Sequence, residues 1–96
     1  MTEKQAVTRI NHFKAAEGKA EELYQFLLSL TEYITNSEGC ELYQVLRQSD
    51  NNNALVVIEK WQSTALHQQS ILDYPKENMQ AAMNLFAEPP SGNYYY

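Results

Sequence analysis

Cysteine, glycine and basic residues are scarce in this chain of 96 residues, and each shortage excludes a class of protein. The single cysteine, Cys40, cannot form an internal disulfide, so a reducing, cytoplasmic setting is the simplest expectation. The 3 glycines are isolated from one another, which excludes a glycine-rich phosphate loop. With 7 basic and 12 acidic side chains the net charge is −5, so phosphate backbones and anionic membrane surfaces repel the chain. We expect no nucleic acid and no membrane as partners.

Long hydrophobic runs and metal-ligand clusters are missing as well. The apolar runs are far shorter than the ~20 residues that span a bilayer, and the polar start Met1–Gln5 opens no signal-peptide core. Two histidines and one cysteine, widely separated, make no metal site. Hydrophobic residues at 44% and charged residues at 20% are typical of a globular protein. We therefore expect a single domain over residues 1–96 and no cofactor.

The hydrophobic pattern predicts alternating strands and helices. Alternation of period two indicates strands at residues 6–14, 40–48 and 54–61, and the polar turn 49–53 makes the last two a hairpin. A helix over 19–35 is predicted by an apolar stripe at steps of three and four residues: Ala20, Leu23, Leu27, Leu30 and Ile34.

The second half of the chain continues this alternation. Ser63 or Thr64 can cap a second helix, which Pro75 interrupts. A further helical stretch carries Met79, Ala82, Met83 and Phe86, and Tyr94–Tyr96 is predicted as a short fourth strand. The order β-α-β-β-α-(α)-β predicts a ferredoxin-like α+β fold with an antiparallel four-stranded sheet.

The strand at 54–61 is apolar on both faces, which indicates that both faces are covered. We expect the helices on one face, together with His12, and an open apolar face formed by Val7, Phe13, Val45, Leu55, Val57 and Trp61. Such a face exceeds the apolar area that soluble monomers expose. A two-fold homodimer that packs the open faces together resolves this. The tail Tyr94–Tyr96 is expected either to cross to the partner's sheet or to fray.

Three sequence segments carry a resemblance to a known family. Ala16-Glu17-Gly18-Lys19, Glu38-Gly39-Cys40 with Tyr43, and Ile58-Glu59-Lys60-Trp61-Gln62-Ser63 resemble, in order and separation, the antibiotic biosynthesis monooxygenases, which include the quinol monooxygenases. The resemblance covers about residues 6–96. It implies a homodimeric α+β barrel with a pocket in each protomer. It also implies oxygen chemistry without flavin, haem or metal, in which a deprotonated quinol or polyphenol itself passes electrons to dioxygen.

The sequence departs from this family at one position. Many members carry a histidine nine residues after the tryptophan that ends the strand. This chain has Ser70 there, or Gln69 if one residue is missing in the turn 64–66, and its own His67 lies six residues after Trp61. The haem-degrading branch pairs a strand asparagine, matched by Asn11, with a later histidine. No histidine follows His67, so we do not expect haem degradation.

Two residues are candidates for proton transfer. Glu59 could act as a base with a raised pKa, although an ion pair with Arg9 or Arg47 is the favoured alternative. His67 suits proton transfer near neutral pH, although a histidine on a helix is more often exposed on the surface.

The candidates for substrate binding are Asn11, Phe13, Tyr43, Arg47 and Trp61. Trp61 could stack on an aromatic substrate or be a core residue. Asn11 could donate to a developing oxyanion or make a structural hydrogen bond. We interpret Tyr24, Tyr33 and Tyr74 as amphipathic packing residues, Met79 and Met83 as core residues at helical spacing, and Cys40 as a small buried filler.

These observations favour a cofactor-independent monooxygenase that uses dioxygen to oxidise a small quinol or polyphenol. The alternative is a non-oxidative member of the same architecture, either a small-molecule isomerase or a ligand-binding, stress-related dimer. The displaced histidine favours that alternative.

Overall fold

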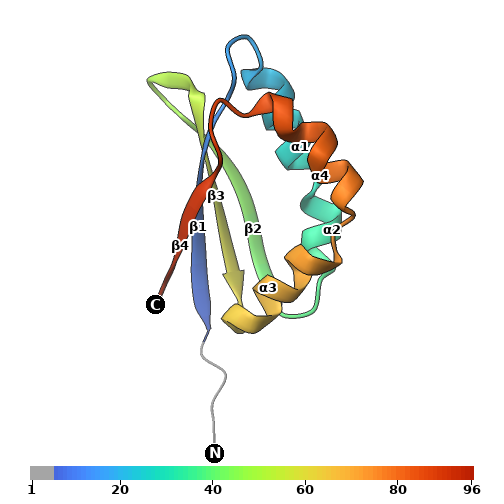
Figure 1. The fold of residues 1–96 in the computed structure, drawn as a ribbon. Helices are drawn as coiled ribbons and strands as arrows, with labels where there is room; N and C mark the ends of the chain where they lie inside the picture. Colours follow the sequence, from blue (N-terminus) through green and yellow to red (C-terminus); the bar gives the residue numbers. More distant parts are fainter. Residues whose placement is uncertain (1–5) are drawn as a thin grey trace, which may run out of the picture.

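A computed structural model describes residues 6–96, so the expectation for Met1–Gln5 lies outside the described residues. The described elements, in chain order, are β1 (Val7–Lys14), α1 (Ala20–Ser29), α2 (Thr31–Thr35), β2 (Cys40–Gln48), β3 (Asn51–Trp61), α3 (Thr64–Asp73), α4 (Lys76–Ala82), the short 3-10 helix η1 (Met83–Leu85) and β4 (Ser91–Tyr95). The strands form one antiparallel sheet in the order β2-β3-β1-β4. This confirms the ferredoxin-like α+β fold (Figure 1).

Two predicted boundaries differ from the structure. The helix predicted over 19–35 divides at Leu30, where the backbone N–H bonds back to the carbonyls of Leu27 and Leu28 and the last turn tightens. The predicted polar turn 49–53 shrinks to two residues, because Asn51 pairs with Gln48 and begins β3. The Asn51 side chain also accepts a hydrogen bond from the backbone N–H of Asn53.

The predicted assignment of the two sheet faces is wrong. The helices cover the face that carries Leu55 and Val57, each 1% exposed, and these side chains pack with Leu23 and Leu27 of α1. The whole set predicted as open lies on this helix-covered face: Val7, Phe13, Val45, Leu55, Val57 and Trp61. His12 is correspondingly exposed on the other face, opposite Val56. Alternation identifies residues that share a face, but it does not identify the face on which helices dock.

No described element covers the opposite side of the sheet, as Figure 1 shows. We call this surface the open sheet face; its apolar centre consists of Ile10, Leu42, Leu46, Val56 and Ile58. Ile10 pairs directly with Ile58, and Leu46 opposite Val56 is 40% exposed. An apolar open face therefore exists, as the sequence predicted, but it is made of the other set of side chains.

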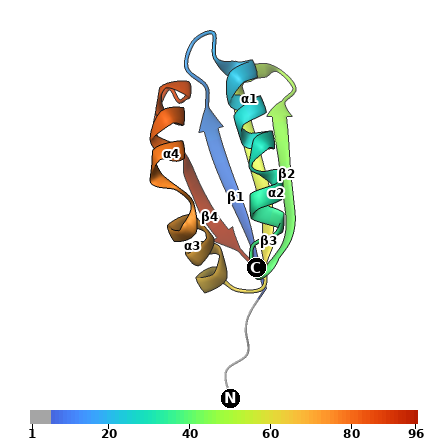
Figure 2. The ribbon, with the colours of Figure 1, turned by 90° about the vertical axis from the view of Figure 1, so that its right-hand side faces the viewer.

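The helices form two columns over the covered face (Figure 2). The Ser63 side chain caps α3 by accepting from the Leu66 N–H, which confirms the predicted helix start, and Pro75 separates α3 from α4. Gly39, with a φ of +88°, turns the chain into β2 where a Cβ would overlap Leu66. Met79 and Met83 are 39% and 60% exposed, so their prediction as core residues is wrong.

β4 is longer than predicted and pairs within the four-stranded sheet of the same chain. It begins at Ser91 and pairs with β1 of the same chain, with Tyr95 opposite Thr8 and Tyr94 opposite Arg9. Residues 91–95 therefore pair within their own chain and do not fray, whereas the crossing of this tail to a partner's sheet stays a prediction. Over residues 6–96, none of the helices has the length and apolar character needed to cross a membrane.

Candidate active site

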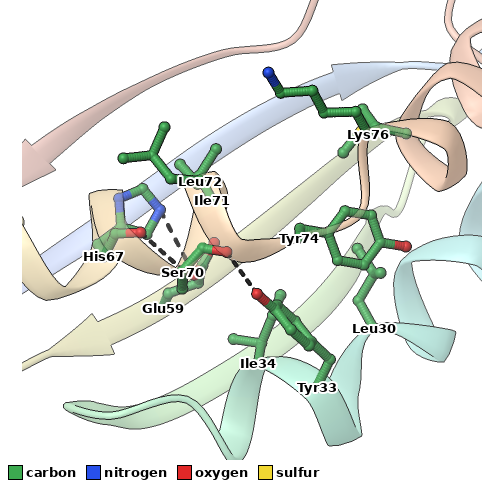
Figure 3. A pocket seen from close by; sticks show the side chains of 11 residues that line it. Leu30, Tyr33, Ile34, Glu59, His67, Ser70, Ile71, Leu72, Tyr74 and Lys76 are labelled. Carbon is green, nitrogen blue, oxygen red and sulfur yellow. Dashed lines mark hydrogen bonds and ion pairs between the residues drawn. The ribbon is translucent and has the colours of Figure 1, made fainter.

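A cavity of about 290 Å³ lies between the sheet and the helices α2, α3 and α4 (Figure 3). Its walls are mainly apolar and aromatic, with Leu30, Tyr33 and Ile34 on one side and Ile71 and Tyr74 on the other. Two ionisable groups reach it from the core: Glu59 is 5% exposed and His67 is 4% exposed. Leu72, which also lines the cavity, is 70% exposed and marks its open side. We call the Glu59–His67 side the closed end.

The Glu59 carboxyl group is held at the end of β3 by two side-chain donors. Its Oε1 accepts from Trp61 Nε1 at 2.9 Å, and its Oε2 accepts from Asn11 Nδ2 at 2.9 Å. Burial raises the pKa of Glu59, while Trp61, the charge of Arg9 and Asn11 oppose that rise. The result is a buried carboxyl group that is a stronger base than one in water.

The ion pair predicted as the alternative for Glu59 does not form. Arg9 Nε donates to Asn11 Oδ1 at 2.8 Å and so reaches Glu59 only through the asparagine amide. Arg47 lies on the surface, pairs with Glu21 at 3.0 Å and stacks on a tyrosine ring.

His67 is buried beside Glu59, and the expectation of an exposed helical histidine is wrong. Its Nε2 lies 3.8 Å from Glu59 Oε1, and its ring meets Trp61 edge-on with 5.4 Å between centroids. The Ser63 cap starts α3 two residues after Trp61, so His67 lies one turn into the helix and faces the sheet. Burial and the positive charge of Arg9 lower the pKa of His67 from 6.5 to about 4, so the ring is neutral near pH 7.

Tyr94 completes the site from β4, and sequence reasoning missed this residue. Its hydroxyl lies 2.8 Å from His67 Nδ1, and Arg9 lies over its ring at 4.7 Å from the centroid. The contact depends on Gly92, because a Cβ there would overlap the Asn11 side chain and approach the Ile10 carbonyl to 2.8 Å. The only signal in the sequence was the alternation along the tail, which puts Tyr94 and Tyr95 on opposite faces.

The other predicted site residues do not line this cavity. Trp61 is fully buried and donates to Glu59, and Tyr43 donates its hydroxyl to the Leu27 carbonyl at 2.6 Å. Phe13 packs against Phe86, with 5.9 Å between ring centroids. The structure thus brings four predicted residues together: Asn11, Glu59, Trp61 and His67. It separates Phe13, Tyr43 and Arg47 from them.

Two tyrosines that we interpreted as packing residues do pack together, and they also line the cavity. Tyr33 donates its hydroxyl to the Ser70 carbonyl at 2.7 Å, which ties α2 to α3. Tyr74 meets the Tyr33 ring edge-on at 5.2 Å. Both present an apolar ring to the cavity and remain anchored by packing, as in many sites for aromatic ligands.

The described residues offer no group of three metal ligands. Between residues 6 and 96, histidine, cysteine, aspartate and glutamate side chains nowhere cluster in threes that could hold an ion. Burial raises the pKa of the partly buried Cys40 thiol, so it has no thiolate character at neutral pH. The chemistry available at the closed end is therefore that of a carboxyl group, a neutral imidazole and hydrogen-bond donors, and Lys76 adds a basic side chain elsewhere in the lining.

Solved structures of similar fold come from bacteria and archaea. PA3566 from Pseudomonas aeruginosa is 20% identical, with a TM-score of 0.86, and the match covers 100% of this chain and 97% of that one. A conserved protein from Methanosarcina mazei is 24% identical, with a TM-score of 0.83 and coverage of 96% and 92%. SnoaB, a cofactor-independent oxygenase from Streptomyces nogalater in a mutant form, is 19% identical, with a TM-score of 0.79 and coverage of 96% and 92%. At these identities the likeness establishes the fold.

Sequence comparison establishes the family. No curated protein matches the chain. The family model for antibiotic biosynthesis monooxygenases matches residues 6–84, which include β1, β3 and α3 and hence Asn11, Glu59 and His67. This chain belongs to the antibiotic biosynthesis monooxygenase family.

Proposed function

We propose that this protein is a cofactor-independent monooxygenase that oxidises a small quinol or polyphenol in the cavity between sheet and helices. The observation that carries this proposal is the buried Glu59 carboxyl group, 3.8 Å from a neutral His67 at the closed end of an apolar cavity. Membership of the monooxygenase family and the fold shared with a cofactor-independent oxygenase support it.

Glu59 is the proposed general base. A phenolic hydroxyl at the closed end reaches its carboxylate, which accepts the proton as the electron-rich phenolate forms. The amide of Asn11 and the indole of Trp61 hold the carboxylate in place through the reaction. Burial raises the pKa of Glu59, which brings it closer to the pKa of a weak acid such as a phenol. Glu59 is therefore a better base for a phenol than an exposed carboxylate would be.

The electrons for dioxygen come from the substrate in this proposal. A quinol that loses four electrons and gains one oxygen atom becomes a hydroxyquinone, and the second oxygen atom leaves as water with two protons from the substrate. The phenolate starts this transfer because it is far easier to oxidise than the neutral phenol. The partly buried apolar side chains of Leu30 and Ile34 limit the access of bulk water to the reactive intermediates.

We also propose that residues 1–96 act as one domain and form a two-fold homodimer through the open sheet face. The pairing of Ile10 with Ile58 at its centre, and the exposure of Leu46, support this surface. Ile58→Lys would place a charge at the centre and should give a folded monomer by light scattering. Leu72→Lys on the helix side is the control and should stay dimeric. A monomeric parent protein at micromolar concentration would contradict the homodimer.

Oxygen uptake by metal-stripped, flavin-free protein with hydroquinone and catechol tests the activity. We expect consumption above the buffer rate, and a loss of about 100-fold or more in Glu59→Gln, the usual effect of removing a general base. Glu41→Gln, at an exposed position of β2, is the matched control and should keep the parent rate. No uptake by the parent protein with any dihydroxyaromatic compound would contradict the oxygenase.

The second candidate is a ligand-binding or isomerase function in the same cavity. Ser70 stands where many family members have a histidine, and its hydroxyl donates to the His67 carbonyl, so the cavity has one imidazole at that end. Binding of a dihydroxyaromatic compound without oxygen uptake would favour this candidate. The single tryptophan, Trp61, beside Glu59 and His67 provides the fluorescence signal for that binding.

A further inference from the structure

We infer that Tyr94 is a positioning residue: its hydroxyl donates to His67 Nδ1, which leaves Nε2–H beside Glu59 as a hydrogen-bond donor for a ligand bound as a phenolate. This assigns base and donor to two different groups, and it rests on the proposed function for the identity of the ligand. His67 then donates a hydrogen bond to the phenolate oxygen that forms when Glu59 takes the proton, and His67 takes up no proton itself.

The first step is the charge state of Glu59. Both of its carboxyl oxygens accept hydrogen bonds from neutral N–H donors, Trp61 Nε1 and Asn11 Nδ2, each at 2.9 Å. Two such donors stabilise the ionised form of a carboxyl group. Arg9, which holds the Asn11 amide through its Nε, adds a positive charge to the same network. Glu59 therefore presents acceptor oxygens to the closed end when the cavity is empty.

The second step is the tautomer of His67. A neutral imidazole has one N–H and one bare nitrogen, and its neighbours select between them. Nε2 lies 3.8 Å from Glu59 Oε1, and a bare nitrogen there would direct its lone pair at a carboxylate oxygen. An Nε2–H is attracted to that oxygen instead. The proton therefore belongs on Nε2, and Nδ1 becomes an acceptor for the Tyr94 hydroxyl at 2.8 Å.

The third step is the place of Tyr94 on a rigid element. β4 pairs with β1 along Tyr94–Arg9 and Gly92–Asn11, so the strand that carries the hydroxyl also contacts the asparagine that holds Glu59. The Arg9 guanidinium lies over the Tyr94 ring, and the Tyr94 and His67 rings meet edge-on at 5.4 Å. These contacts fix the hydroxyl opposite Nδ1 and limit rotation of the imidazole.

The fourth step is what the closed end can bind. The 3.8 Å separation of Nε2 and Oε1 is too long for a direct hydrogen bond, so the Nε2–H has no close acceptor among the described residues. A ligand oxygen beside both groups can donate a proton to Glu59 and then accept from Nε2–H as an anion. A phenol fits this sequence, and an aryl ether, which has no proton to give, does not.

Heteronuclear NMR of isotope-labelled histidine tests the assignment without any turnover. His12→Gln removes the only other histidine, so this variant serves as the parent for the experiment and its spectrum reports His67 alone. We expect a protonated Nε2 and a hydrogen-bonded, unprotonated Nδ1. Tyr94→Phe should move the Nδ1 resonance to that of a free nitrogen, and Tyr95→Phe, the exposed neighbour on the other face, should leave it in place. A proton on Nδ1 in the parent, or no response to Tyr94→Phe, would overturn the inference.

Binding of para-nitrophenol gives the second readout. Its absorbance distinguishes phenol from phenolate, so anaerobic titration measures both the affinity and the form bound. We expect phenolate in the cavity and an affinity about tenfold weaker in Tyr94→Phe, the loss expected for one hydrogen bond. Tyr95→Phe should bind like the parent, and equal affinity in both variants would overturn the role of Tyr94. Since neither readout needs oxygen, a protein that passes both and consumes no oxygen refutes only the monooxygenase.

Discussion

Acidification should destabilise this protein through His67. The folded state lowers the pKa of His67 from 6.5 to about 4, so the unfolded chain takes up a proton that the folded protein resists. The stability that this group contributes is complete above the unfolded pKa and is lost as the pH falls from 6.5 towards 4. The full shift is worth about 3 kcal/mol. Water that enters the cavity reduces this, and we expect a loss of about 2 kcal/mol.

Urea unfolding at several pH values measures this loss. Glu59 acts in the opposite sense, because its raised pKa lets the folded state take up a proton first on acidification. The comparison therefore uses His67→Gln, which retains Glu59, and His12→Gln, which removes the exposed histidine of the open sheet face. His67→Gln should be less stable near neutral pH but lose clearly less stability on acidification than the parent. His12→Gln should follow the parent. Parallel pH profiles for the parent and His67→Gln would refute the buried, neutral histidine.

Three substitutions and one control test the packing that supports the site, each measured as the free energy of unfolding. Leu23→Ala in the fully buried core should cost about 2–5 kcal/mol, whereas Leu72→Ala at the open side of the cavity should be nearly neutral; equal losses would contradict the core assignment. Gly92→Ala should cost about 1–3 kcal/mol, because a Cβ there meets the Asn11 side chain, and an unchanged stability would contradict that close approach. Trp61→Phe replaces the indole with a smaller aromatic ring and removes a donor from a buried carboxylate, so we expect a loss of at least about 1–3 kcal/mol and a higher pKa for that group.

The sequence predicted the fold and the grouping of side chains on each strand. Alternation along β3 placed Glu59 with Trp61, and alternation along β1 placed Asn11 on the same face, which the hydrogen bonds confirm. Alternation could not choose the face that the helices cover. Leu55 and Val57 on one side, and Val56 and Ile58 on the other, are equally apolar, so only the docking of α1 decides between them.

The burial of His67 and the role of Tyr94 depend on tertiary contacts that periodicity does not encode. In α3, Ile71 and Leu72 are 59% and 70% exposed, so these apolar residues do not identify the side of the helix that is buried. The buried side of this helix holds a histidine and a serine, which are ordinarily surface residues. Tyr94 meets His67 from a strand 27 residues later, and the register of β4 against β1 fixes that contact.

The fate of the two oxygen atoms of dioxygen tests the central proposal most directly. Metal-stripped protein is mixed with a quinol under isotopically labelled dioxygen, and mass spectrometry follows the aromatic product while a peroxide assay follows the solution. The monooxygenase proposal predicts one labelled oxygen atom in the product, no hydrogen peroxide, and neither result above background in Glu59→Gln. A product without label, accompanied by hydrogen peroxide, would contradict it.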